Sequence, residues 1–96
     1  MREKSKKFPS PEKLTANRVL VIDDDPLITK VLEKGLANLG YTVSVGRHGQ
    51  DAAYLVLEFK PDVVILDIML PDIDGEEICK RIRASSAARE VKIISM

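Results

Sequence analysis

Two short, continuous apolar runs, at residues 19–22 and 63–66, stand out along the chain. Both are rich in β-branched residues, which is typical of strands buried on both faces of a sheet. Apolar and polar residues alternate over 41–45, and another β-branched segment covers 91–95. We therefore predict four strands, with ordered structure beginning at Arg18.

Between these strands the apolar residues recur at helical spacing. Asp25 and Pro26 combine an N-cap carboxylate with a proline at the first helical position, and Gly40 marks the end of that helix. Two further helices are predicted over 50–59 and 76–83. Their inward faces are expected to consist of Ala52, Ala53, Val56 and Phe59 in one and of Ile78, Cys79 and Ile82 in the other. Alternating strands and helices predict an α/β fold, a doubly wound parallel sheet with helices on both faces.

Composition narrows the class of protein. The 96 residues hold 15 basic and 15 acidic side chains, a net charge of zero that argues against direct nucleic acid binding. A single cysteine excludes an internal disulfide, and no apolar run is long enough for a membrane span. We expect no membrane association and a cytoplasmic location, because the charged N-terminus has no apolar signal core. Residues 1–17 carry a net charge of +3 and are expected to form a basic, flexible leader.

Acidic residues directly follow both continuous runs. Asp23 and Asp24 follow the first run, and Asp67 follows the second. If the two strands are neighbours, these carboxylates converge at the carboxyl edge of the sheet, where open α/β sheets bind ligands. Clustered carboxylates resist ionisation unless a cation neutralises them, and hard oxygen ligands with open positions suit Mg²⁺.

The other polar residues near this edge have simpler interpretations. Asp25 is expected to be only a helix cap, and Asp72 and Asp74 to be turn residues outside the site. His48 stands alone in a turn and is expected to be a surface residue. A backbone carbonyl at Met69, two residues past Asp67, could turn toward a metal.

The segments Val-Leu-Val-Ile-Asp-Asp-Asp-Pro, Pro-Asp-Val-Val-Ile-Leu-Asp-Ile-Met-Leu-Pro and Asp-Gly occur in this order. As a set they resemble the receiver domain of bacterial two-component response regulators, from Arg18 to the end of the chain. The resemblance implies a flavodoxin-like receiver fold in a domain covering 18–96. It also implies that Asp67 accepts a phosphoryl group from a sensor histidine kinase or phosphotransfer protein. Asp23, Asp24, Asp67 and the carbonyl of Met69 would then hold Mg²⁺.

This resemblance implies a signalling module rather than an enzyme, one that catalyses only its own phosphorylation and dephosphorylation when complete. Members of the family have a fifth strand, two further helices, a switch Ser or Thr, a switch aromatic residue and a Lys, whose positions fall beyond Met96. We therefore expect a fold truncated after the fourth strand and, at best, slow phosphorylation of Asp67. We also expect self-association through the truncated edge, because unpaired strand edges invite pairing.

Other function classes fit the residues less well. A phosphorylation-silent interaction module remains open. A fragment of a haloacid dehalogenase-type phosphatase also begins with a strand ending in Asp-x-Asp, but it expects Thr or Val soon afterwards, where this chain has Pro26 and Leu27. A dinucleotide-binding domain is excluded, because three acids replace the glycine-rich loop that would hold a pyrophosphate.

Overall fold

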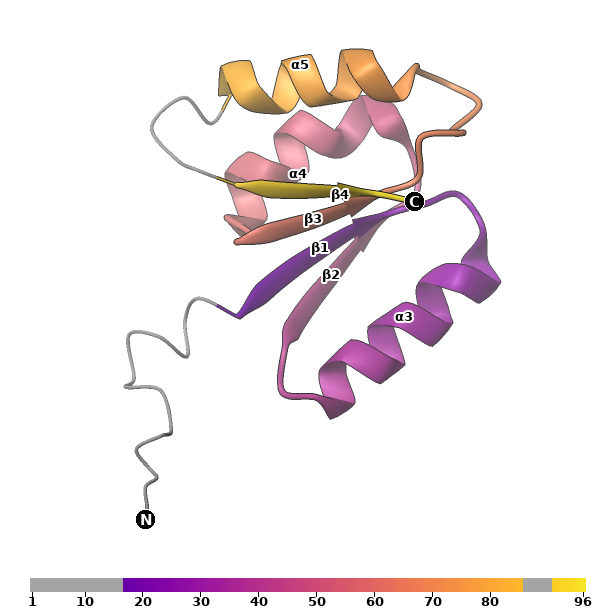
Figure 1. Cartoon of the computed structure of the whole chain (residues 1–96), viewed down its shortest axis with the longest axis vertical. Helices are drawn as coiled ribbons and strands as arrows, with labels where there is room; N and C mark the ends of the chain where they lie inside the picture. Colours follow the sequence, from indigo (N-terminus) through magenta and orange to yellow (C-terminus); the bar gives the residue numbers. More distant parts are fainter. Residues whose placement is uncertain (1–16, 86–90) are drawn as a thin grey trace.

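The computed structural model describes residues 17–85 and 91–96, in which strands and helices alternate (Figure 1). The elements are β1 (Arg18–Ile22), α3 (Pro26–Asn38), β2 (Thr42–Gly46), the 3₁₀ helix η1 (Gly49–Asp51), α4 (Ala52–Phe59), β3 (Val63–Leu66), α5 (Gly75–Ser85) and β4 (Lys92–Ser95). Apart from Asn17, the predicted basic leader lies outside the described residues. Residues 86–90, between α5 and β4, also lie outside them.

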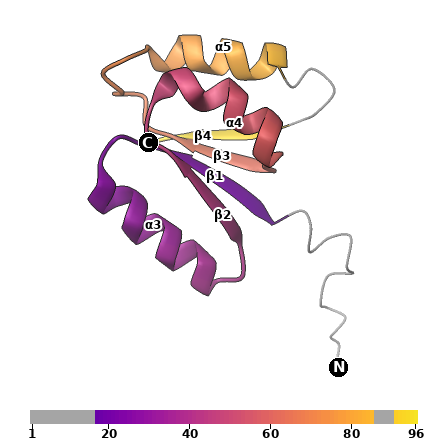
Figure 2. The same cartoon turned by 180° about the vertical axis from the view of Figure 1, so that it is seen from behind.

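The four strands form one parallel sheet in the order β2-β1-β3-β4. Val19 of β1 pairs with Val43 on one side and with Val63 on the other. The strand order therefore reverses between β1 and β3, as the predicted crossovers require. Helix α3 covers one face of the sheet, and α4 and α5 lie together on the opposite face (Figures 1 and 2). The predicted doubly wound α/β fold is thus confirmed.

The main core lies between the sheet and the α4–α5 pair. Its fully or almost fully buried side chains come from the sheet, from α4 and α5, and from the adjoining loops: Leu20, Ile22, Ala52, Val56, Val64, Leu66, Leu70, Ile78, Ile82 and Val91. The predicted inward face of the third helix is therefore confirmed. That of the second is confirmed for Ala52, Val56 and Phe59, whereas Leu55 rather than Ala53 packs against the core. Phe59 and Cys79 are partly buried at the margin of this core.

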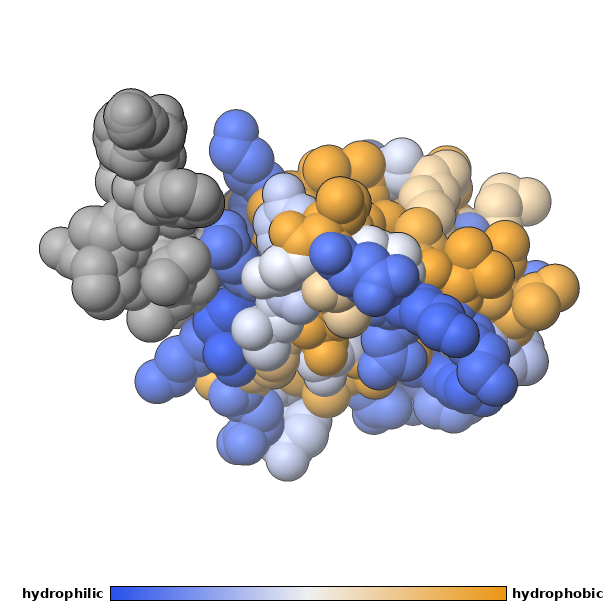
Figure 3. Space-filling view, turned by 90° about the horizontal axis from the view of Figure 1, so that it is seen from below, coloured by the Kyte–Doolittle hydropathy of each residue, from blue (hydrophilic) through white to orange (hydrophobic). Residues whose placement is uncertain are grey.

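The face that α3 covers is less completely buried. Thr29 is the one buried residue of α3, while Leu27, Ile28 and Val31 are exposed. Seen from below, apolar side chains lie beside a ridge of polar ones (Figure 3). The expectation of a strand buried on both faces is correct for β1 but wrong for β3, because Val63 and Ile65 on this side are only half-buried.

The amino ends of β1 and β3 are tied together around Arg18. Its backbone amide donates to Asp62 Oδ2 at 3.0 Å, and its Nε donates to the Phe59 carbonyl at 2.9 Å. The guanidinium carbon lies 4.1 Å from the centre of the Phe59 ring. Lys60, the residue after Phe59, ends α4 in the left-handed conformation, with a φ of 55°. At this end of the sheet, the Arg18 guanidinium is therefore paired with the Phe59 ring and carbonyl, and the Arg18 amide is paired with Asp62.

Candidate functional site

The candidate site begins where β1 and β3 end. Ile22 and Leu66 pair in register, so the residues that follow them, Asp23 and Asp67, leave the sheet side by side. The Asp67 amide donates to the Ile22 carbonyl at 2.9 Å, and the Asp23 amide donates to the Gly46 carbonyl at 3.0 Å. The parallel ladder thus fixes the backbone that carries both carboxylates.

Three carboxylates meet at this edge. Oxygen atoms of Asp23, Asp24 and Asp67 all lie within 4.8 Å of one another. Asp23 is buried, with 4% of its surface exposed, Asp67 is half-buried and Asp24 is exposed. We call these three side chains the acid group; it is the set of converging residues that the sequence predicts.

The acid group has an electrostatic cost that falls mainly on Asp23. Burial raises the pKa of the Asp23 carboxyl above its ordinary value, because a buried carboxylate loses solvation. The negative charges of Asp67 and Asp24 and a side-chain hydrogen bond with Asp67 raise this pKa further. The Asp25 amide donates to Asp23 Oδ1 at 3.0 Å and offsets only part of the shift. A cation at this position would remove the cost.

The neighbouring residues are placed much as expected. Asp25 Oδ1 accepts from the Leu27 amide at 2.9 Å, so this carboxylate caps α3 and stays outside the acid group. Asp67 Oδ1 accepts from the Met69 amide at 2.8 Å, which turns the chain back beside the acid group. The Met69 side chain is 80% exposed. The role of its carbonyl as a metal ligand stays a prediction.

A hollow of about 360 Å³ opens above the acid group. It is lined by Asp23, Asp24, Asp25, Ile28, Asp67 and Met96. Four of these residues are aspartates and two, Ile28 and Met96, are apolar. The carboxylate oxygens are hard donors that fit Mg²⁺, which keeps several waters and accepts phosphate oxygens as further ligands. Among the described residues no second group of three metal-ligating side chains gathers in this way.

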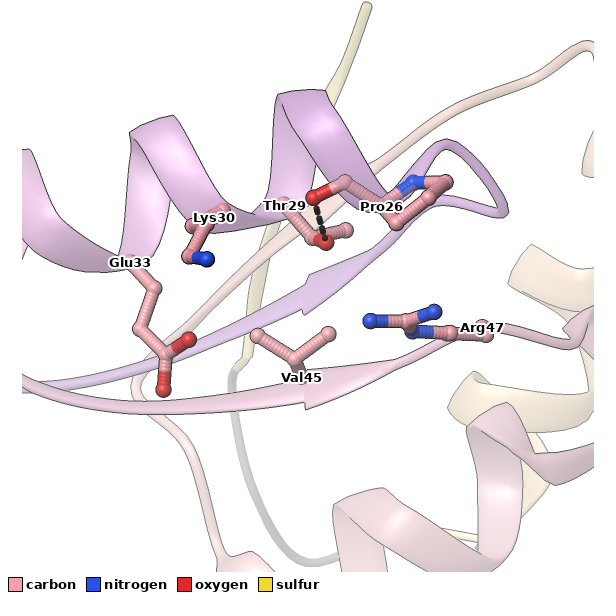
Figure 4. A pocket seen from close by; sticks show the side chains of 6 residues that line it. All are labelled: Pro26, Thr29, Lys30, Glu33, Val45 and Arg47. Carbon is pink, nitrogen blue, oxygen red and sulfur yellow. Dashed lines mark hydrogen bonds between the residues drawn. The ribbon is translucent and has the colours of Figure 1, made fainter.

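A second hollow, of about 410 Å³, lies between α3 and β2 (Figure 4). Lys30 and Glu33 line it from the helix, and Val45 and Arg47 line it from the strand and the residue after it. Thr29 is buried there, and its hydroxyl donates to the Pro26 carbonyl at 3.1 Å. This hollow contains mixed charges rather than a set of metal ligands, and we assign it no chemistry.

One contact near the site was not predicted from the sequence. Asp72, interpreted as a turn residue, accepts hydrogen bonds from the Gly49 and Gln50 amides at 3.1 and 3.0 Å. No sequence signal links these positions, because they are 23 and 22 residues apart. His48 is exposed, as expected. Within the described part of the chain, no helix is both long and apolar enough to cross a membrane.

Comparison with curated proteins finds similar chains among regulators. The chain is 44% identical over 72 residues to the probable transcriptional regulator ycf27 of Guillardia theta, a match that covers 75% of this chain and 28% of that protein. It is 38% identical over 68 residues to the response regulator MprA of Mycolicibacterium vanbaalenii, covering 71% and 29% respectively. The matched region therefore spans less than a third of each of these relatives.

Solved structures show the same fold. The BeF3-activated N-terminal receiver domain of RstA from Klebsiella pneumoniae superposes with a TM-score of 0.73 at 30% identity, covering 82% of this chain and 65% of that one. The chemotaxis response regulator CheY4 of Vibrio cholerae gives 0.75 at 28% identity, covering 81% and 65%. The family model of the response regulator receiver domain matches residues 19–96. With its strand order, its acid group and this match, the chain belongs to the response regulator receiver domain family.

Proposed function

We propose that this chain, over the domain 18–96, accepts a phosphoryl group on Asp67 in a two-component phosphorelay, with Mg²⁺ held by the acid group. The observation that carries the proposal is the convergence of Asp23, Asp24 and Asp67 within 4.8 Å at the end of two adjacent parallel strands. Like charges in contact are costly, so their juxtaposition supports a site built for a cation and a phosphoryl group.

Asp67 is the best placed of the three to act as the nucleophile. All three line the hollow, but Asp67 is half-buried, whereas Asp23 is buried and Asp24 is exposed. A carboxylate oxygen of Asp67 attacks phosphorus and forms a new P–O bond. The P–N bond to the donor imidazole breaks, and its electron pair returns to the imidazole nitrogen. The product is an acyl phosphate on Asp67.

The remaining acids prepare the site for this transfer. Asp23, Asp24 and the Met69 carbonyl would hold Mg²⁺ beside Asp67, with the Asp25 amide orienting Asp23 and the Met69 amide orienting Asp67. When bound, Mg²⁺ neutralises charge on the phosphoryl oxygens. The chain then acts on itself, promoting its own phosphorylation and dephosphorylation and turning over no separate substrate.

The partner implied by this chemistry is a protein that carries a phosphohistidine, either a sensor histidine kinase or a phosphotransfer protein. The proposal places the chain in the cytoplasm, where the nucleotide that phosphorylates such a kinase is available. It includes no direct contact with nucleic acid, since basic and acidic residues balance at 15 each.

The direct test is incubation of the chain with Mg²⁺ and acetyl phosphate, followed by intact mass spectrometry. The parent is expected to gain one phosphoryl group slowly, over a long incubation, and Asp67→Asn is expected to gain none. Asp74→Asn is the matched control, because Asp74 is an exposed acid in the same loop and outside the acid group. Its mass gain should equal that of the parent.

Two outcomes would contradict the assignment. One is phosphorylation of Asp67→Asn that survives acid, which would indicate Ser or Thr as the acceptor. The other is release of phosphate from a range of phosphate esters, which would indicate a phosphatase. Absence of any mass gain in the parent would favour a phosphorylation-silent interaction module.

A second proposal concerns self-association. Ile94 and Met96, at the β4 edge, are 52% and 45% exposed, and Val31 of α3 is 62% exposed. Exposed apolar side chains beside a strand edge favour pairing with a second copy of the chain. Sedimentation at micromolar concentration should show a dimer or larger species. A compact monomer with a cooperative thermal transition would contradict this proposal.

A further inference from the structure

The loop of residues 68–74 carries the backbone that lies next to Asp67. At its start, the Met69 amide donates to Asp67 Oδ1 at 2.8 Å. At its end, Gly75 packs against Ile68, so that a Cβ there would approach the Ile68 Cα to 3.1 Å. Leu70 enters the core and is 7% exposed. The loop is therefore attached at both ends and through Leu70, and residues 71–74 lie between Leu70 and the second attachment.

Asp72 attaches this segment to η1. Its two carboxylate oxygens accept from two consecutive backbone amides, Gly49 at 3.1 Å and Gln50 at 3.0 Å. These amides begin η1, which leads directly into α4. The first amides of a helix have no acceptor within the helix, and a nearby side chain normally caps them.

The local residues do not supply that cap. Neither His48 before η1 nor Asp51 before α4 makes a side-chain capping hydrogen bond. Asp72 supplies it from a loop that lies more than twenty residues further along the chain. The start of α4 and the loop after Asp67 are therefore held to each other by one carboxylate.

Gly49 makes this approach possible. A Cβ at this position would overlap Ile73 Cγ2, would lie 2.7 Å from Ile78 Cδ1 and would approach Asp72 Oδ1 to 3.2 Å. The loop and the turn are thus in close van der Waals contact around the hydrogen bonds. Desolvation raises the pKa of Asp72, but hydrogen bonds from Gln50, Gly49 and its own amide, together with the charge of His48, lower it by more. The resulting pKa, below the ordinary value, is consistent with a carboxylate that accepts in its charged form.

We propose that Asp72 is a positioning residue for the acid group. By capping η1 it fixes the middle of the loop, and the loop in turn holds the Met69 backbone against Asp67. The part of this inference that concerns metal binding rests on the proposed function, in which the Met69 carbonyl is a ligand. The part that concerns the Met69 amide does not.

The test uses the full 96-residue chain and two readouts. Amide hydrogen exchange by NMR follows the Met69 amide in the absence of metal, and a Mg²⁺ titration gives the dissociation constant. In Asp72→Ala the Met69 amide should exchange faster, while the α5 amides keep their protection. The dissociation constant for Mg²⁺ should rise about tenfold, as is common when a group that orients a metal ligand is removed.

Two variants make the test specific. Asp72→Asn keeps one acceptor oxygen and the side-chain volume, so it should show smaller effects of the same sign, and it serves as the test variant if alanine unfolds the chain. Asp51→Ala removes an exposed acid from the same turn that makes no capping hydrogen bond. Its Met69 exchange and its Mg²⁺ affinity should match those of the parent.

The inference is overturned if Asp72→Ala loses stability but keeps the parent's Met69 exchange, because Asp72 would then be merely structural. It is also overturned if Asp51→Ala changes Mg²⁺ affinity as much as Asp72→Ala does, because the effect would then be one of net charge. A parent chain that ignores Mg²⁺ would contradict the proposed metal site. The exchange rate of the Met69 amide in the metal-free chain would still decide the role of Asp72.

Discussion

The two ends of the sheet use charge in opposite ways. At the amino ends of β1 and β3, the Arg18 guanidinium lies over the Phe59 ring and donates to its carbonyl, and the Arg18 amide donates to Asp62. At the carboxyl ends of the same strands, Asp23 and Asp67 lie together with Asp24, and no cationic side chain of the described residues lines their hollow. One end is paired internally, and the other gathers like charges.

The amino end of the sheet contributes to folding stability, whereas the carboxyl end carries the candidate site. Paired groups at the amino end stabilise the fold, because the half-buried Arg18 amide and Nε both find acceptors. The acid group costs folding free energy, and the raised pKa of Asp23 is the sign of that cost. Such a group is retained where a ligand neutralises its charge. Without that ligand, substitutions at the two ends of the sheet should change the free energy of unfolding with opposite signs.

The largest change in the free energy of unfolding is expected from Arg18→Ala. This change removes the contact with the Phe59 ring and the charged hydrogen bond to the Phe59 carbonyl. The free energy of unfolding should fall by about 2 kcal/mol, measured by urea denaturation.

Arg47→Ala is the matched control at the other end of the sheet, since Arg47 is exposed and its side chain makes no hydrogen bond or ion pair within the described residues. That variant should lie within about 0.5 kcal/mol of the parent. Equal losses in the two arginine variants would show that the paired end is no more stabilising than any exposed charge.

In the absence of metal, Asp23→Asn should raise the free energy of unfolding, whereas Arg18→Ala should lower it. Asparagine keeps an oxygen to accept from the Asp25 amide while it removes a buried charge beside Asp67 and Asp24. The free energy of unfolding near neutral pH should rise by about 1 kcal/mol, the weaker end of the range for charges about 4 Å apart. A metal-free variant less stable than the parent would contradict the cost assigned to the acid group.

The pH dependence of this gain follows from the direction of the Asp23 pKa shift. The folded-state pKa lies above the unfolded value, so the folded state binds the proton more tightly. The parent's stability from this group is complete below the unfolded pKa and is lost as pH rises through the folded pKa. The advantage of Asp23→Asn should therefore grow across that interval and then stay constant. A difference independent of pH would indicate a packing effect.

The smallest effect is expected at Lys60, which ends α4 with a φ of 55°. Glycine has no Cβ to clash with the backbone in this left-handed conformation, so Lys60→Gly should raise the free energy of unfolding by about 0.5 kcal/mol. Lys60→Ala removes the same charge but keeps the Cβ, and it should bring no gain. A gain in the alanine variant would attribute the effect to charge.

The carboxyl end was largely predictable from the sequence. Continuous apolar runs identify β1 and β3, and an acid directly after each run can be located in a parallel sheet without coordinates. The convergence of Asp23, Asp24 and Asp67 follows from that order. The half-burial of Val63 and Ile65 does not follow, because it depends on what packs over β3 rather than on the strand itself.

The pairings at the amino end and the cap from Asp72 could not be predicted. Arg18 and Phe59 are 41 residues apart, and Asp72 lies 23 residues from Gly49. Their side chains have ordinary local interpretations, a strand start and a turn acid. Only the packing of α4 and of the loop after β3 brings these partners together.

The central claim is that the acid group is a Mg²⁺ site, and the stability of the parent and of Asp23→Asn with and without Mg²⁺ tests it most directly. Without metal the variant should be the more stable chain. At a Mg²⁺ concentration ten times its dissociation constant, the parent should gain roughly 1.4 kcal/mol and overtake the variant, which should gain little. Asp24→Asn should also lose most of the Mg²⁺ effect. Equal stabilisation of parent and variants, or none in the parent, would contradict the claim.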